Sequence, residues 1–147
     1  MATASSSRTA AVLGATGAVG KEVVRALLQR GWSEVHLLSR RDPDVPDADA
    51  RVVHHTVPMR EGGVGGPLET HCATILQQHS VDAVFVTMGV GAPSQFKGEE
   101  GAAHLTRVDV TLPTACARGA RASGSVKHVS ILTAVNANVN AKPDTSD

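Results

Sequence analysis

Three glycines spaced three residues apart, between a short apolar run and a helical pattern, constrain this chain more than any other feature. The run Thr9–Leu13 leads directly into the segment Gly14-Ala15-Thr16-Gly17-Ala18-Val19-Gly20. A short apolar run that ends at a glycine is typical of a buried strand. Over residues 19–30, apolar side chains recur at helical spacing and charged ones take the other side. The feature predicts a strand–turn–helix unit.

The rest of the chain alternates strand and helix patterns. We expect strands at Glu34–Ser39, 51–57, 81–88 and 126–132, and helices at 68–79 and 98–119, the second of them kinked at Pro113. Such alternation favours an α/β fold: a doubly wound, Rossmann-like parallel sheet of about five strands in the order 3-2-1-4-5. The sheet is expected to be incomplete at its C-terminal edge. Flexible ends are expected at 1–8 and 136–147.

Each glycine of the turn has a physical task in a dinucleotide site. Gly14 turns the chain out of the strand, Gly17 lets the backbone approach a pyrophosphate, and Gly20 lets the helix pack close to the sheet. The free amides at the start of the helix then face the phosphates. Residues 9–135 are therefore expected to form an NAD(P)-binding domain. The alternative is a tight strand–helix turn that binds nothing.

The residues after the second strand bear on which dinucleotide is bound. An NAD site places an acidic residue about 20 residues past the glycines, where it holds the ribose 2′-hydroxyl. This chain has Arg40 and Arg41 at that place. Because arginine suits bidentate contacts to phosphate, we expect the 2′-phosphate of NADP to be preferred over NAD. The two arginines could instead be a solvated pair balanced by Asp42 and Asp44.

Several segments together resemble a known family. They are the glycine segment 14–20, Leu-Leu-Ser-Arg-Arg at 37–41, Val-Asp-Ala-Val-Phe at 81–85 with the glycines after it, Arg-Val-Asp at 107–109, and the run 127–134. The chain resembles the atypical short-chain dehydrogenase/reductases of the NAD(P)-binding Rossmann superfamily, most of all the Tat-interacting-protein-like oxidoreductases. The resemblance implies cofactor contacts at Gly14, Thr16, Gly17, Ala18, Val19, Arg40, Met88 and Gly89.

Ala15 and Arg41 complete the expected cofactor site. A plain glycine turn after the fourth strand is the alternative reading of Met88 and Gly89. In the family a Ser or Thr closes the fifth strand near the nicotinamide, and Thr133 matches that place, so Thr133 is the candidate catalytic residue.

The chain departs from the family at its proton donor. The family usually carries a Tyr-x-x-x-Lys pair, in which the tyrosine acts as general acid and base. This sequence contains no tyrosine, and Lys142 has Asn138 four residues before it. We therefore expect an NADP-binding oxidoreductase-like protein with weak or absent activity. The alternative is a non-catalytic module that senses the cofactor or binds a protein.

Composition excludes several other classes. Fourteen Lys and Arg balance fourteen Asp and Glu, which argues against nucleic acid as a partner, and no apolar run approaches a membrane span. Cys72 and Cys116 are expected to be reduced buried thiols of a cytoplasmic protein. We expect no metal site: His54 and His55 are adjacent on a strand and point to opposite faces. The unfinished sheet edge predicts a homo-oligomer or a partner chain.

Overall fold

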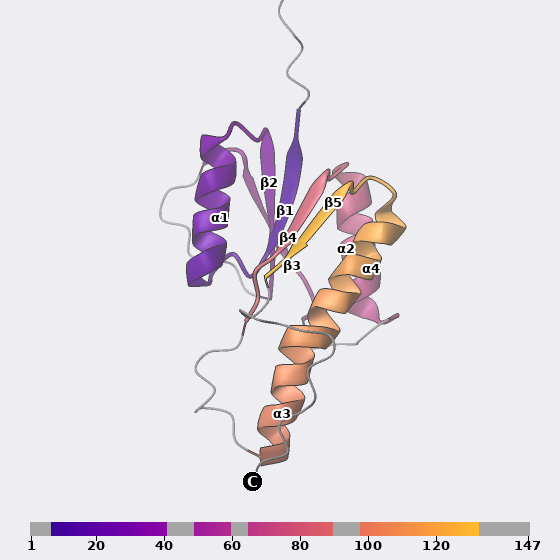
Figure 1. Ribbon diagram of the computed structural model, residues 1–147. Helices are drawn as coiled ribbons and strands as arrows, with labels where there is room; N and C mark the ends of the chain where they lie inside the picture. The colour runs from indigo at the N-terminus through magenta and orange to yellow at the C-terminus, as the bar shows by residue number, and fades with distance from the viewer. Residues whose placement is uncertain (1–6, 41–48, 60–64, 90–97, 133–147) are drawn as a thin grey trace, which may run out of the picture.

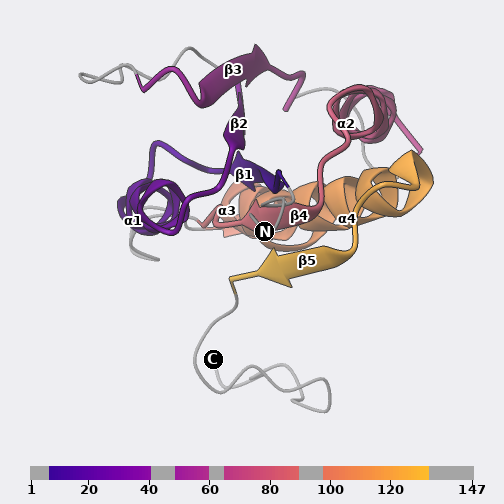
Figure 2. The same ribbon diagram turned by 90° about the horizontal axis from the view of Figure 1, so that it is seen from above.

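The computed structural model describes residues 7–40, 49–59, 65–89 and 98–132. Five parallel strands form one sheet: β1 (Thr9–Leu13), β2 (Glu34–Ser39), β3 (Val52–Thr56), β4 (Ala83–Val86) and β5 (His128–Ile131). Their spatial order is β3-β2-β1-β4-β5, which confirms the predicted order (Figure 2). The order reverses at β1, so the glycine segment after β1 lies at the switch point of the sheet.

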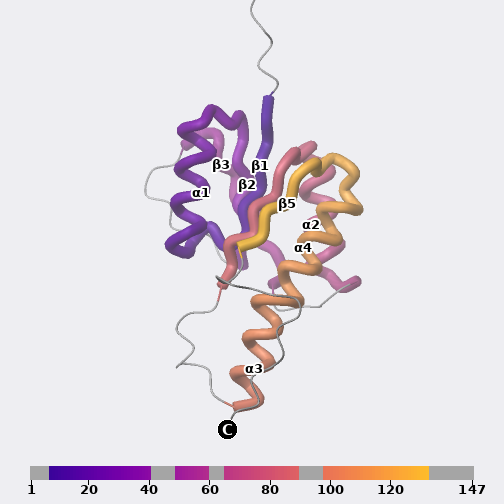
Figure 3. The backbone as a smooth tube through the Cα atoms, in the orientation of Figure 1, coloured from indigo at the N-terminus to yellow at the C-terminus, as the bar shows by residue number. Residues whose placement is uncertain are grey.

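Helices cover both faces of this sheet, as predicted. The helical segments are α1 (Ala18–Gln29), α2 (Pro67–Gln78), α3 (Gly98–Thr106), the π-helical η2 (Arg107–Thr111) and α4 (Leu112–Ser123). Figure 1 shows α1 on one face and the pair α2 and α4 on the other. The tube in Figure 3 shows that α3 extends past the carboxyl ends of the strands.

The alternation of side chains along β1 divides the core in two. Ala10 and Val12 pack with Leu27 on the α1 side, whereas Ala11 and Leu13 belong to the cluster under α2 and α4. All five residues of β1 are buried, as is expected of a central strand covered on both faces. The central strand therefore fixes the position of the turn that follows it.

The helix predicted at 98–119 extends further in the structure than expected, and its regular hydrogen bonding is interrupted. It runs from α3 through η2 to α4 and ends at Ser123, where Gly124 takes the left-handed conformation (φ 73°). Pro113 lies in the first turn of α4, directly after the π-helical segment. A proline lacks the amide donor and crowds the carbonyl four residues earlier, here Asp109, so widening of the helix over η2 accommodates it. The irregularity predicted at Pro113 thus takes the form of a π turn.

The β5 edge is the least covered part of the sheet. Val129, Ile131 and Leu132 are 36%, 40% and 50% exposed, unlike the buried Val84 and Val86 beside them on β4. Strands β4 and β5 are shorter than the predicted strands 81–88 and 126–132, because pairing between them begins at Ala83 and at His128. The expected flexible ends fall mostly outside the described residues. None of the described helices is long and apolar enough to cross a bilayer.

Candidate functional site

Two of the three glycines in the turn are required by packing alone. Gly14 has φ +82°, and a Cβ there would lie 2.9 Å from the backbone nitrogen of Met88. A Cβ on Gly20 would overlap the carbonyl oxygen of Gly14 and lie 2.8 Å from the Cα of Ala15. Both contacts are with backbone, which cannot move aside cheaply. Gly14 and Gly20 therefore bring β4 and α1 close to the turn.

Gly17 differs from the other two glycines. Its backbone is extended (φ −77°, ψ 167°), and among the described residues a Cβ there would meet only the carbonyl oxygen of Gly14, at 3.4 Å. Gly17 is exposed and is the N-cap of α1, yet no side chain in the described part of the chain caps this helix, and its first turn carries no acidic residue. Its amide is held by the Gly14 carbonyl at 3.1 Å. The fold itself does not demand a glycine at this position.

The start of α1 is consequently suited to an anion. The first amides of a helix have no carbonyl partner within the helix, and the helix dipole places partial positive charge there. Thr16, Ala18 and Val19 around them are exposed, whereas Ala15 is buried. A phosphate could approach these amides because Gly17 places no side chain in front of them.

A cleft of about 730 Å³ opens at the carboxyl ends of four strands. Its lining includes residues that follow β1, β2, β3 and β4 in turn: Gly14, Arg40, Met59 and Met88. Thr16, Gly17 and Gly89 also line it, and Arg40 is exposed at its border. The volume is typical of a small-molecule or cofactor site. The position is the one at which open parallel sheets bind ligands.

Two side chains connect the elements around this cleft by hydrogen bonds to backbone carbonyls. The Thr87 hydroxyl donates to the carbonyl of Leu13 at 2.8 Å and lies 3.2 Å from that of Gly14, so it ties the end of β4 to the turn. The guanidinium of Arg107 donates from Nη2 to the carbonyl of Met59 at 2.6 Å, which ties η2 to the segment after β3. The cleft is thus bounded by backbone held at fixed positions.

The structure gathers most of the predicted cofactor residues at one place. Gly14, Thr16, Gly17, Arg40, Met88 and Gly89 all line the cleft. Arg41 and Thr133 lie outside the described residues. Sequence reasoning missed His104, Arg107 and Val108, which line the cleft from the long helix. The signal in the sequence was Pro113, which marks an irregularity in the long helix. The structure shows that irregularity as a π turn at Arg107–Thr111, and such turns are frequent at functional sites.

Cys72 and Cys116 are free, buried thiols, as predicted, and they face each other between α2 and α4. A hydrogen bond with Cys72 and burial raise the pKa of the Cys116 thiol. With its pKa raised, the Cys116 thiol contributes packing rather than nucleophilic chemistry. The helices approach closely here because Gly119 has no side chain: a Cβ there would lie 2.8 Å from the Glu69 carbonyl oxygen.

A group of histidines lies on the α2 side of the sheet and does not line the cleft. His36, His55 and His79 come from β2, β3 and the end of α2. Burial lowers the pKa of His36, and burial together with the neighbouring imidazoles lowers that of His55 to about 4. These two rings are therefore uncharged at neutral pH. His54 points to the other face, toward Ser39 at 2.7 Å, as the alternation along β3 predicts.

Comparison with known families agrees with this geometry. The model of the NAD dependent epimerase/dehydratase family matches residues 10–146. The chain belongs to this family. A search of curated proteins finds no significant match. The match covers the glycine turn, the cleft and, except for Thr9, all five strands. It does not confirm the predicted membership of the Tat-interacting-protein-like oxidoreductases.

Solved structures with this fold include three that are informative. WbmF of Bordetella bronchiseptica in complex with NAD+ is 17% identical (TM-score 0.70) and aligns over 96% of this chain and 40% of its own. UDP-glucose 4-epimerase of Thermotoga maritima is 16% identical (TM-score 0.65; 84% and 37%). A short-chain dehydrogenase/reductase of Burkholderia thailandensis is 20% identical (TM-score 0.62; 84% and 50%). The epimerase/dehydratase-type chain described here therefore spans half or less of the length of these proteins.

Proposed function

We propose that residues 9–135 are the cofactor-binding domain of an oxidoreductase-like protein, and that the cleft binds an NAD(P) dinucleotide with its pyrophosphate at the start of α1. The observation that carries this proposal is Gly17. Packing accounts for Gly14 and Gly20, but nothing within the described residues requires a glycine at position 17. The close approach of a ligand to uncapped helical amides does require one.

NADP is the proposed form of the cofactor, with NAD as the weaker ligand. Arg40 supports this preference because it is exposed, lines the cleft and follows β2, the strand whose end meets the adenosine ribose in such folds. Arg41 is proposed to assist it. WbmF was solved with NAD+, so the preference has to be measured on this chain rather than carried over from the neighbour.

These 147 residues are proposed to bind the cofactor with weak or absent turnover. The nicotinamide supplies hydride chemistry when it is bound, and the protein contributes position and a proton. Thr133 is the proposed residue to orient a carbonyl group. A matched proton donor is missing from this stretch, because the sequence has no tyrosine. The protein is proposed to act in the cytoplasm, where thiols such as Cys72 stay reduced.

A second candidate function is that of an interaction module. The exposed apolar side chains of Val129, Ile131 and Leu132 favour it, because an uncovered apolar edge strand is a surface on which another chain can pair. On this view the cofactor controls binding of a protein instead of a reaction. The resemblance of the Leu-Leu-Ser-Arg-Arg run at 37–41 to the Tat-interacting-protein-like oxidoreductases is compatible with either candidate.

Titration of the purified protein with NADPH and NADH, followed by cofactor fluorescence, tests the proposal. In Gly17→Asp the added carboxylate faces the phosphates, so affinity for both cofactors should fall at least about tenfold. Folding should be retained, because aspartate is a good N-cap and the site accepts a Cβ. Thr74→Asp, on the exposed side of α2, is the matched control.

The preference for NADP has its own variant. Arg40→Ala should weaken NADPH binding about tenfold and leave NADH binding unchanged, since an exposed charged contact to phosphate contributes about 1.5 kcal/mol. Arg30→Ala is the control, because Arg30 is the C-cap of α1, at the end of the helix away from the proposed phosphate site. Equal affinity of the unaltered protein for NADPH and NADH would contradict the role of Arg40. Turnover of a carbonyl panel would contradict the proposed lack of a proton donor.

A further inference from the structure

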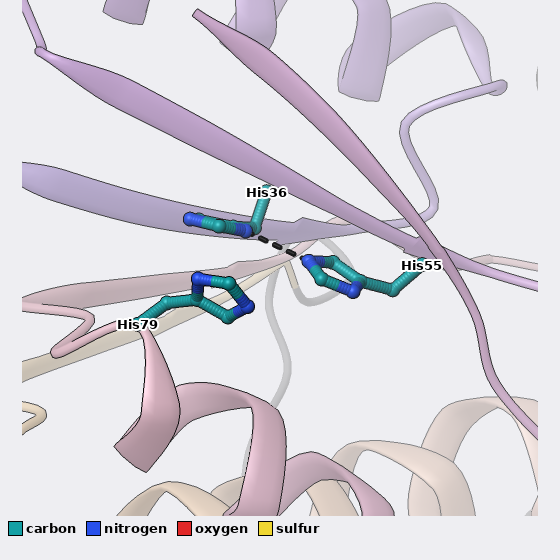
Figure 4. A group of neighbouring side chains, drawn as sticks. All are labelled: His36, His55 and His79. Atoms are coloured by element: carbon teal, nitrogen blue, oxygen red, sulfur yellow. Dashed lines mark hydrogen bonds between the residues drawn. The ribbon is translucent and has the colours of Figure 1, made fainter.

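Three imidazoles from different elements converge on one point beneath the sheet. Figure 4 shows the rings of His36, His55 and His79 directed toward one another from β2, β3 and the end of α2. One nitrogen of each ring lies within 4.8 Å of the corresponding nitrogens of the other two. The ring centroids of His36 and His79 are 4.3 Å apart, and both rings lie 5.1 Å from that of His55.

The register of the sheet places the first two histidines side by side. His55 pairs with Leu38 and Val53 with His36, so His36 and His55 lie on the same face of adjacent strands, on the α2 side. The third, His79, is the C-cap of α2 and reaches the pair from the helix. Since strands and a helix end hold the three side chains, the group is a product of the fold and not of a loop.

The hydrogen bonding of His36 indicates how its ring is protonated. Nδ1 of His36 lies 2.8 Å from Nε2 of His55, so one proton is shared along this line. Nε2 of His36 is buried without a hydrogen-bond partner among the described residues, and it lies 3.3 Å from a carboxylate oxygen of Glu34. The geometry falls short of a hydrogen bond, but a bare lone pair facing a carboxylate would be repelled. The single ring proton of neutral His36 is therefore favoured on its own Nε2, which faces Glu34.

This arrangement leaves the lone pair of His36 Nδ1 directed into the cluster. A histidine that presents one nitrogen to a metal ion usually donates its other N–H to a carboxylate or carbonyl, which fixes the tautomer. The Glu34 carboxylate, 3.3 Å from Nε2 of His36 and carried by a side chain that is 40% exposed, needs only a small adjustment to accept that hydrogen bond. The His36 ring itself is fully buried, so its position is fixed by the packing around it.

From this geometry we propose that His36, His55 and His79 bind a divalent transition-metal ion, with Zn²⁺ as the expected occupant, and that Glu34 positions His36. Zinc–nitrogen bonds of about 2.0–2.1 Å place neighbouring ligand nitrogens about 3.3 Å apart in a tetrahedral site. To reach this geometry, the 2.8 Å separation between the His36 and His55 nitrogens has to widen slightly. The distances from these two nitrogens to that of His79, which are at most 4.8 Å, have to shorten. Rotation of His55 and His79, which are only half-buried, can supply this movement.

The chemistry of the ligands selects the metal class. Three neutral imidazoles without a thiolate suit Zn²⁺ and its neighbours in the first transition row, and do not suit Ca²⁺ or Mg²⁺, which prefer oxygen. A fourth tetrahedral position would fall to water. Because the three ligands join β2, β3 and α2, the bound ion would stabilise the β3 edge of the sheet. The site is separate from the cofactor cleft, so it does not depend on the proposed dinucleotide binding.

Calorimetric titration of the tag-free, chelator-treated 147-residue protein with ZnCl₂ tests the site. We expect one Zn²⁺ per chain and a rise in the unfolding temperature. His55→Gln and His79→Gln should weaken Zn²⁺ binding at least about tenfold, since each removes a ligand. Both residues are half-buried, so these variants should fold even if one at the buried His36 does not. His128→Gln, exposed on β5, should bind zinc as the unaltered protein does.

The role of Glu34 has a separate readout. Glu34→Gln keeps the size of the side chain and should weaken Zn²⁺ about tenfold without changing the stoichiometry. Co²⁺ in place of Zn²⁺ should give the strong visible absorption of a four-coordinate site, and this absorption should be lost in His79→Gln. Absence of saturable Zn²⁺ binding, or zinc binding that survives His55→Gln and His79→Gln alike, would show that the three rings form only a hydrogen-bonded cluster.

Discussion

Substitution of Gly20 by alanine should destabilise the protein, although the same change usually stabilises a helix. In an unstrained helix interior, alanine is favoured over glycine by roughly 0.5–1 kcal/mol. At Gly20 the added Cβ would overlap the carbonyl oxygen of Gly14 and lie 2.8 Å from the Cα of Ala15, whereas 3.4–4 Å is ordinary contact. Both obstacles are backbone, so α1 has to move away from the turn. Overpacking of this kind costs about 1–3 kcal/mol or more.

The net effect of Gly20→Ala is an expected loss of about 2 kcal/mol. For a domain of this size that corresponds to a fall of roughly 4–8 °C in the unfolding temperature. Urea unfolding followed by fluorescence of Trp32, the single tryptophan, measures this loss directly, because the ring is partly buried and packs edge-on against Phe85 at a centroid distance of 6.4 Å beside the core. Gly17→Ala is the control, and its expected loss is under about 1 kcal/mol. If Gly20→Ala were as stable as the unaltered protein, the packing argument for this glycine would be refuted.

Two further predictions concern an ion pair and the open sheet edge. The carboxylate of Asp49 accepts hydrogen bonds from Arg51 at 2.8 Å and 3.0 Å, which lowers its pKa from 3.8 to about 2. A carboxyl group whose pKa is lowered by folding stabilises the folded state at pH values above its pKa in the unfolded chain. The stability deficit of Asp49→Asn in urea unfolding should therefore shrink as the pH falls from about 5 toward 2. A deficit that does not change with pH would contradict this prediction. Light scattering should find a dimer or larger species, and Ile131→Lys should convert it to monomer. A monomeric unaltered protein would contradict pairing through β5.

The sequence predicted the sheet order because each element could be recognised by its own local pattern. Glu34–Ser39 has the predicted bounds, and all of its residues except Glu34 are buried, as fits a parallel strand covered on both faces. The glycine turn was recognisable because its neighbours on both sides, strand and helix, carried independent signals. The helix over 98–119 was found, but its π turn depends on how the backbone adjusts around Pro113, which periodicity does not record.

The cleft was predicted in part and the histidine group was missed, for related reasons. Residues directly after strands can be assigned to the carboxyl edge once the sheet is parallel, and this argument found Gly14, Arg40 and Met88. His36 and His55 meet only because β2 and β3 pair in a particular register, and His79 joins them through the placement of α2. Contacts of this kind, between residues far apart in sequence, need the register and the helix position together.

The most direct test of the dinucleotide site is an NMR titration of the ¹⁵N-labelled protein with NADPH. The proposed binding mode predicts that the largest amide shifts fall on Gly17, Ala18 and Val19, at the start of α1, with saturation at one NADPH per chain. Gly17→Asp should abolish these shifts while its spectrum remains that of a folded protein. Saturable NADPH binding that leaves these three amides unmoved, or no binding at millimolar cofactor, would contradict the proposal.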